Sequence, residues 1–384
     1  MAQGRLVAAI LAGLALAMAS GLSFIWNTGR TASGVVDLGG LAAHPQRSMD
    51  AATLAFRRDR GKLDQVDHGQ LDAALAQAPL EAAPFVYAGA QLANAGRLAE
   101  AERLLDIATH RNPRSREARA LLLQNAMASG NGRAAVTQIE VMYRLQRDER
   151  PVLSEALIYL ASMPETRPST LAAISDNRHR RDVLQGMARW GASPAMLISA
   201  KQALGDLDLG RDRDDFVRSL VNSLLAIKDW SGARRVWSTY YPDATDRSGL
   251  VVDPSFTGQF GPPFGWTVQS APNGEADLGE SGLTGRYSGS ERAELARQLV
   301  LADPGQYRLS IKSADTGNGL WIEVACAGST AIAEQQVTAG SQGLNVTVGS
   351  DCRALDVMIL ARPSALQSSQ GFRLTSLQME RIGS

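Results

Sequence analysis

Residues 82–113 read AAPFVYAGAQLANAGRLAEAERLLDIATHRNP and predict two short amphipathic helices with a turn near Gly96. The residues expected to pack this pair together are Phe85, Gly89, Leu92, Ala101, Leu105, Ala108 and Pro113. Gly89 and Ala101 are small, so the two helices can approach closely while the larger side chains fill the space around them. A helical hairpin of this size cannot bury its own apolar face, so the stretch predicts neighbouring hairpins on both sides.

The same pattern recurs along the chain at a spacing of 34 residues. The positions that repeat it are Leu71, Ala74 and Pro79 upstream, Ala135, Ile139 and Met142 downstream, and later the pairs Val183 with Val217 and Met187 with Val221. This spacing and residue pattern resemble the tetratricopeptide repeat. The resemblance implies an α-solenoid of helical hairpins over residues 48–242 that binds protein partners, and a generic helical bundle is the alternative.

The N-terminal segment contains an apolar run, Leu6 to Trp26, between Arg5 and Arg30. About 20 apolar residues suffice to cross a bilayer. We expect residues 1–30 to form an uncleaved single-span anchor and residues 31–47 a linker, which places the rest of the chain in the periplasm beside an inner membrane. The alternative is a cleaved signal peptide, because Ala17-Met18-Ala19 resembles a cleavage site.

The charge balance argues against nucleic acid as a partner. Lys plus Arg and Asp plus Glu are equal at 39 each, so the chain is formally neutral. Nucleic-acid binding needs a concentrated basic surface to meet phosphates. We therefore expect partners of other kinds.

The helical period ends near Pro242, and after a predicted linker over 243–250 the chain becomes rich in short alternating apolar runs separated by turn residues. This pattern predicts an antiparallel, jelly-roll-like β-sandwich over 251–384. Three motifs resemble the sandwich of carbohydrate-binding modules: Asp253-Pro254-Ser255-Phe256, Phe264-Gly265-Trp266 and Pro304-Gly305-Gln306-Tyr307. The resemblance implies glycan binding, with Trp266, Tyr287 and Trp321 as candidate stacking platforms. The alternative for each ring is a place in the core.

The only two cysteines, Cys326 and Cys352, both fall in the predicted sandwich. An exported protein meets an oxidising environment, where paired cysteines form disulfides, so we expect these two to be bonded. Two free buried thiols are the alternative.

Residue patterns for catalysis or metal binding are missing from the sequence. The four histidines, at positions 44, 68, 110 and 179, form no ligand pair at helical spacing, and neither a phosphate loop nor a nucleophile elbow is present. We expect no metal, no cofactor and no enzymatic activity. A glycan-cleaving carboxylate pair such as Asp277 with Glu280 is the remaining enzymatic alternative.

Together these features predict a membrane-tethered accessory protein for surface polysaccharide production or export. The repeats would bind protein and the sandwich would bind glycan. The main rival is an assembly scaffold whose sandwich contacts only protein. Trp230 and Trp237 fall at packing spacing, and we expect them to seal the last hairpin.

Overall fold

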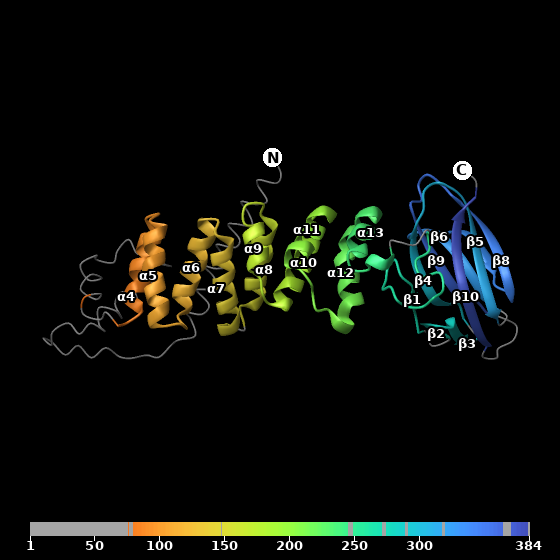
Figure 1. Cartoon of the computed structure of the whole chain (residues 1–384), viewed down its shortest axis with the longest axis horizontal. Helices are drawn as coiled ribbons and strands as arrows, with labels where there is room; N and C mark the ends of the chain where they lie inside the picture. The colour runs from red at the N-terminus through yellow and green to blue at the C-terminus, as the bar shows by residue number, and fades with distance from the viewer. Residues whose placement is uncertain are drawn as a thin grey trace. The chain divides into compact units, whose positions relative to one another are not determined.

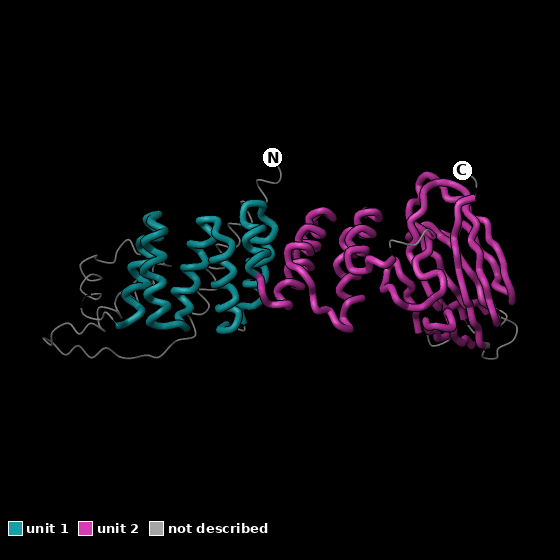
Figure 2. Tube along the Cα trace, in the orientation of Figure 1, with its two compact units in different colours: residues 1–173 teal, residues 174–384 magenta. Residues whose placement is uncertain are grey.

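The structure is a computed structural model that describes residues 76, 80–146, 148–244, 249–270, 274–288, 291–316, 319–363 and 370–382. The expected anchor over 1–30, the linker over 31–47 and the repeat positions Leu71, Ala74 and Pro79 lie outside these residues. Within the described part, no helix is long and apolar enough to cross a membrane. The chain divides into two compact units, residues 1–173 and 174–384 (Figure 2).

The described helices of unit 1 form consecutive antiparallel hairpins (Figure 1). Their bounds are α4 (Ala83–Asn94), α5 (Leu98–Arg111), α6 (Arg116–Ala128), α7 (Gly132–Leu145), α8 (Arg150–Ser162) and α9 (Arg167–Ala173). Side-chain caps fix two of the starts, because Ser115 accepts from the N–H of Ala118 and Asn131 accepts from that of Ala134.

The α4–α5 hairpin packs through small residues at its centre. A Cβ at Gly89 would lie only 2.7 Å from Cγ of Leu105, so a larger residue would push the helices apart. Ala101, Leu105 and Ala108 are fully buried. Phe85 and Leu92 are partly buried, and Pro113 is exposed in the turn that follows α5.

Four hairpins end their first helix with one shared turn motif. After the C-cap residue comes a residue with positive φ, and the next N–H bonds to the carbonyl five residues back, as Arg97 does to Leu92. This is the Schellman arrangement, which satisfies the last carbonyls of a helix. The C-cap residues are Ala95, Ser129, Trp190 and Ile227, and the positive-φ residues are Gly96, Gly130, Gly191 and Lys228.

Unit 2 begins with two further hairpins. Their helices are α10 (Asn177–Arg189), α11 (Pro194–Leu204), α12 (Arg213–Ala226) and α13 (Trp230–Ser238), with short 3-10 turns at Gly210–Asp212 and Pro242–Ala244. The 34-residue spacing appears directly in the structure, because the side-chain amide of Gln185 donates to the hydroxyl of Ser219, 34 residues later, at 2.8 Å.

The rest of unit 2 is a sandwich of two five-stranded antiparallel sheets. Sheet A has the order β1-β4-β9-β6-β7 and sheet B the order β2-β3-β10-β5-β8. The strands are β1 (Thr267–Val268), β2 (Gly274–Gly279), β3 (Gly282–Tyr287), β4 (Ala293–Leu301), β5 (Gly305–Asp315), β6 (Leu320–Cys326), β7 (Ala331–Gln336), β8 (Gly340–Val348), β9 (Ala354–Ala361) and β10 (Gln370–Arg381). This strand order is that of a jelly roll, so the predicted fold, helical hairpins followed by a sandwich, is confirmed.

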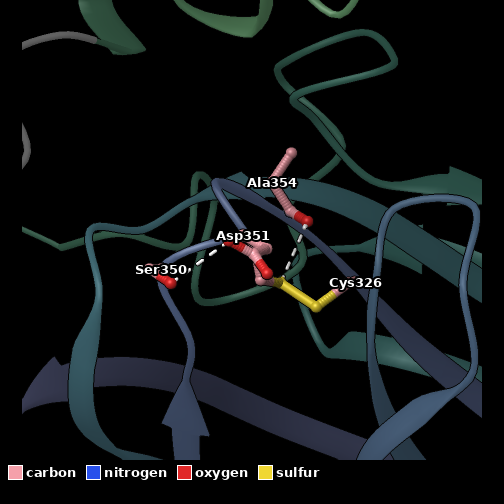
Figure 3. The surroundings of a disulfide bond; sticks show 5 residues. Cys326, Ser350, Asp351 and Ala354 are labelled. Atoms are coloured by element: carbon pink, nitrogen blue, oxygen red, sulfur yellow. Dashed lines mark hydrogen bonds between the residues drawn. A yellow bond between two sulfur atoms is a disulfide. The ribbon is translucent and has the colours of Figure 1, made fainter.

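The sandwich core lies between the inner faces of the two sheets. Ile322 and Val357 of sheet A and Leu309 and Leu374 of sheet B are among its fully buried side chains. The predicted disulfide is also confirmed: Cys326, at the end of β6, is bonded to Cys352, just before β9 (Figure 3).

An aromatic cluster joins the last hairpin to the segment that leads into the sandwich. Trp237 of α13 is fully buried, stacks on Tyr241 and donates its indole N–H to the carbonyl of Gly261 at 3.0 Å. Phe264 meets the same ring edge-on, and Arg234 lies over it at 4.5 Å. Burial lowers the pKa of Arg234 to about 10. The other candidate, Trp230, is only partly buried.

Candidate functional site

Two of the three predicted stacking platforms lie in the core. Trp266 is 3% exposed, donates its indole N–H to the carbonyl of Asp253 at 3.0 Å and packs against Phe256. Tyr287 is 2% exposed. A sugar ring needs an accessible aromatic face, so burial removes Trp266 and Tyr287 from a stacking role.

Trp321 has a different environment. In β6, Leu320, Ile322 and Val324 point into the core, so the alternation of the strand directs Trp321 and Glu323 to the outer face of sheet A. The ring is partly exposed and packs against Leu360 and Met358 of the neighbouring strand β9. The outer face of sheet A is therefore the candidate site.

Strand register gathers charged residues around Trp321. In sheet A, Glu323 pairs with Met358 of β9 and Glu334 of β7, and Met358 pairs in turn with Arg297 of β4. Paired residues share one face of a sheet, so residues far apart in sequence meet there. The outer face also carries Asp356 of β9 and Glu294 of β4, with Arg292 and Arg362 just outside the strands.

Glu323 is the centre of one ion-pair network. Its side chain is 8% exposed, and Nη2 of Arg292 donates to both of its carboxylate oxygens at 3.0 Å. Nη2 of Arg362 donates to Glu323 at 3.0 Å and to Glu334 at 2.5 Å. The Arg362 guanidinium also lies 4.3 Å from the ring centre of Trp321, a cation–π contact that ties the indole to the network.

A second ion pair lies beside the first. Arg297 holds Asp356 with two hydrogen bonds, Nε to Oδ1 at 3.0 Å and Nη2 to Oδ2 at 2.5 Å. The Asp356 side chain is 7% exposed and that of Arg297 is 43% exposed. The neighbouring Glu294 accepts from the side-chain amide of Gln269 at 3.0 Å.

The surroundings of several of these side chains shift their pKa values, and the cause of each shift can be identified. The hydrogen bond to Arg362 lowers the pKa of Glu334, and the same bond raises the pKa of Arg362. The hydrogen bond to Asp356 raises the pKa of Arg297. Burial raises the pKa of Glu294, with the positive charge of Arg297 opposing it. These shifts keep Arg297 and Arg362 charged and keep Glu334 a hydrogen-bond acceptor.

The arrangement suits binding by hydrogen bonds. Ion pairs hold the guanidinium and carboxylate planes in fixed orientations, while the exposed parts of Arg292, Arg297 and Glu334 keep donors and acceptors open to solvent. Three arginines and four carboxylates leave the surface close to neutral.

The candidate catalytic pair does not lie on this face. Asp277 belongs to β2 in sheet B, Glu280 follows in the β2–β3 turn, and both side chains are exposed. Across the described ranges, no group of three His, Cys, Asp or Glu residues could hold a metal ion.

A second polar surface lies on the repeats of unit 2. A hollow of about 400 Å³ is lined by Asn177, Arg178, Arg181, Asp182 and Gln185 of α10. Arg181 pairs there with Asp212 at 3.4 Å. These side chains offer donors and acceptors suited to the polar backbone of a bound segment.

Sequence reasoning missed all of the charged residues of this site. Two of them could have been identified from the sequence, because Glu323 interrupts the apolar run Leu320–Cys326 and Asp356 interrupts the apolar run Ala354–Ala361. A lone acid in a strand buried on both faces needs a cationic partner. Arg292, Arg297 and Arg362 could not be identified as those partners without the strand order.

A scan of family models finds no match to this chain, and a search of curated proteins finds none. Among solved structures, the module TmCBM61 in complex with β-1,4-galactotriose is similar at 14% identity and a TM-score of 0.26, covering 35% of this chain and 100% of its own. YrrB, a TPR protein with an unusual peptide-binding site, is similar at 16% identity and a TM-score of 0.25, covering 46% of this chain and 93% of its own. At these scores neither likeness bears on function.

Proposed function

We propose that this protein is a non-catalytic binding protein that holds a glycan on the outer face of sheet A and a protein partner on its helical repeats. The observation that carries the glycan part is the position of Trp321, a partly exposed ring within a fixed network of arginines and carboxylates. The partly exposed indole, which packs on the buried Leu360, supplies apolar area, and the charged groups supply hydrogen bonds to hydroxyls.

The cellular role follows from features outside the site. An apolar run at Leu6–Trp26 supports attachment to a membrane, and a disulfide supports an oxidising compartment such as the periplasm. In that setting a protein that binds both glycan and protein fits an accessory role in making or exporting a surface polysaccharide. Helical repeats that stack in series supply the extended surface for the protein partner.

The test is glycan-array binding by the full-length protein and two variants. Trp321→Ala should weaken binding about tenfold, since an aromatic contact contributes up to about 1.5 kcal/mol. The matched control is Trp190→Ala, which removes a more exposed indole from a helical turn and should bind like wild type. If no surface polysaccharide binds to the wild-type protein, the glycan part of the proposal is wrong.

The same face supports a second candidate, docking of a protein onto sheet A. Tryptophan and arginine are the residues most enriched at the energetic centres of protein interfaces, and Trp321 lies beside Arg362. This interpretation predicts a partner whose capture by the full-length protein is lost in Trp321→Ala, with no signal on the glycan array.

A further inference from the structure

Two hairpin turns of unit 2 carry large apolar side chains in solvent. Trp190, at the end of α10, is 43% exposed, and Ile227, at the end of α12, is 72% exposed. Both occupy the C-cap position of the shared turn motif. In unit 1 the same position holds Ala95 and Ser129, so this backbone geometry forms without a large apolar residue there.

Each apolar residue has an exposed basic neighbour. Arg189 precedes Trp190, and Lys228 follows Ile227. Lys228 has φ of 59°, at the position where the other three turns have glycine. A left-handed backbone disfavours a side chain, so the turn geometry itself gives no reason for a lysine.

The two turns are neighbours in space. A Cβ at Gly232, near the start of α13, would lie 2.4 Å from Cγ of Pro194, the first residue of α11. The helices that follow the two turns therefore start side by side. We call Arg189, Trp190, Ile227 and Lys228 the two-turn edge.

We propose that the two-turn edge contacts the surface of a lipid bilayer that contains anionic headgroups. Tryptophan prefers the membrane–water interface, isoleucine partitions into the acyl region, and Arg and Lys are attracted to anionic lipids. Two apolar and two basic side chains by themselves give only weak attachment to a bilayer. The apolar run Leu6–Trp26 of the same chain, the anchor of the proposed function, would be the stronger attachment.

Charges around the edge set how strong this contact can be. A cleft of about 710 Å³ beside Lys228 is also lined by Arg353 and Arg381, and by the acidic residues Asp229, Asp303 and Glu380. Near Lys228 the basic side chains are therefore matched in number by acidic ones. We expect a moderate preference for anionic lipid, carried mainly by Arg189 and Lys228.

Site-directed fluorescence tests the contact directly. The two native cysteines are bonded to each other, so Trp190→Cys or Ile227→Cys in the full-length protein introduces one reactive thiol. On phosphatidylglycerol–phosphatidylcholine vesicles, a polarity-sensitive label at either position should shift to the blue and be quenched by brominated lipid. The matched control is Ser129→Cys, the same motif position in unit 1, whose label should not change. Labels at 190 and 227 that behave like the label at 129 overturn the proposal.

A second measurement isolates the charge. Lys228→Gly removes the cation and places the residue that the positive φ favours, so a folding defect cannot explain its effect. In a protein that also carries Ile227→Cys, Lys228→Gly should weaken the fluorescence response of the label to anionic vesicles about fivefold. The reason is that one basic residue near an anionic surface contributes about 1 kcal/mol. An unchanged response rejects the role of Lys228. Glycan binding by the same variants without vesicles tests the Trp321 site separately, so failure of one proposal is distinct from failure of the other.

Discussion

The two sheets of the sandwich share one core but have different outer faces. In sheet A, strand β9 is buried along its whole length on both faces, and Glu323 and Asp356 are held by arginines. In sheet B, side chains such as Lys312 and Glu380 extend from the outer face into solvent. Sheet A therefore buries charged side chains on its outer face, which destabilises the fold unless every charge is paired.

Removing the disulfide should destabilise sheet A most, because Cys326 ends β6 and Cys352 lies just before β9. A Cys326→Ala, Cys352→Ala double variant opens a loop with a sequence separation of 26, and we expect a loss of about 3 kcal/mol in the free energy of unfolding. Denaturant unfolding measures the loss, and amide exchange should rise more in β6 and β9 than in β3 and β10. Equal increases in both sheets would contradict this expectation.

Removing the charge of Glu323 should have the next largest effect. Glu323→Gln leaves Arg292 and Arg362 without their shared carboxylate, and we expect a loss of about 2 kcal/mol, moderated because both arginines reach solvent. The matched substitution Glu380→Gln, on the open face of sheet B, should cost less than about 0.5 kcal/mol. Similar costs for the two variants in denaturant unfolding would remove the distinction between the faces.

The smallest expected change in stability is that of Glu294→Gln, and it depends on pH. Burial raises the pKa of Glu294 in the folded protein, so its ionised form is destabilising at neutral pH, and the penalty disappears as pH falls through the raised pKa. Glu294→Gln should therefore be more stable than wild type at pH 7, by less than about 1 kcal/mol because the side chain is partly exposed. The gain should shrink on acidification. Thermal unfolding across pH tests this, and a constant difference would contradict it.

The repeats were predictable from the sequence because their signal is local. Gly89 and Leu105 belong to adjacent helices and meet within one hairpin, and the 34-residue spacing relates Val183 to Val217 in the sequence itself. The jelly roll was also predictable as a class, from turn residues and alternation alone.

The candidate site was less predictable because it is made of distant residues. Trp266, just before β1, is buried in the core, whereas the alternation of strand β6 directs Trp321 away from it. Arg297 meets Asp356 across 59 residues, a pairing set by the strand order of sheet A. Short sequence patterns do not predict that strand order.

The burial of Trp237 has a consequence for the timing of folding. Its ring is covered by Phe264 and capped by the carbonyl of Gly261, which lie downstream of α13 in the chain. A chain that emerges from the ribosome or a translocation channel exposes its N-terminal parts first, at roughly 5–20 residues per second. The last hairpin must therefore wait a second or more for the segment that covers it. During that interval the Trp237 side chain is accessible. We therefore expect a chaperone to bind the last hairpin rather than the earlier ones.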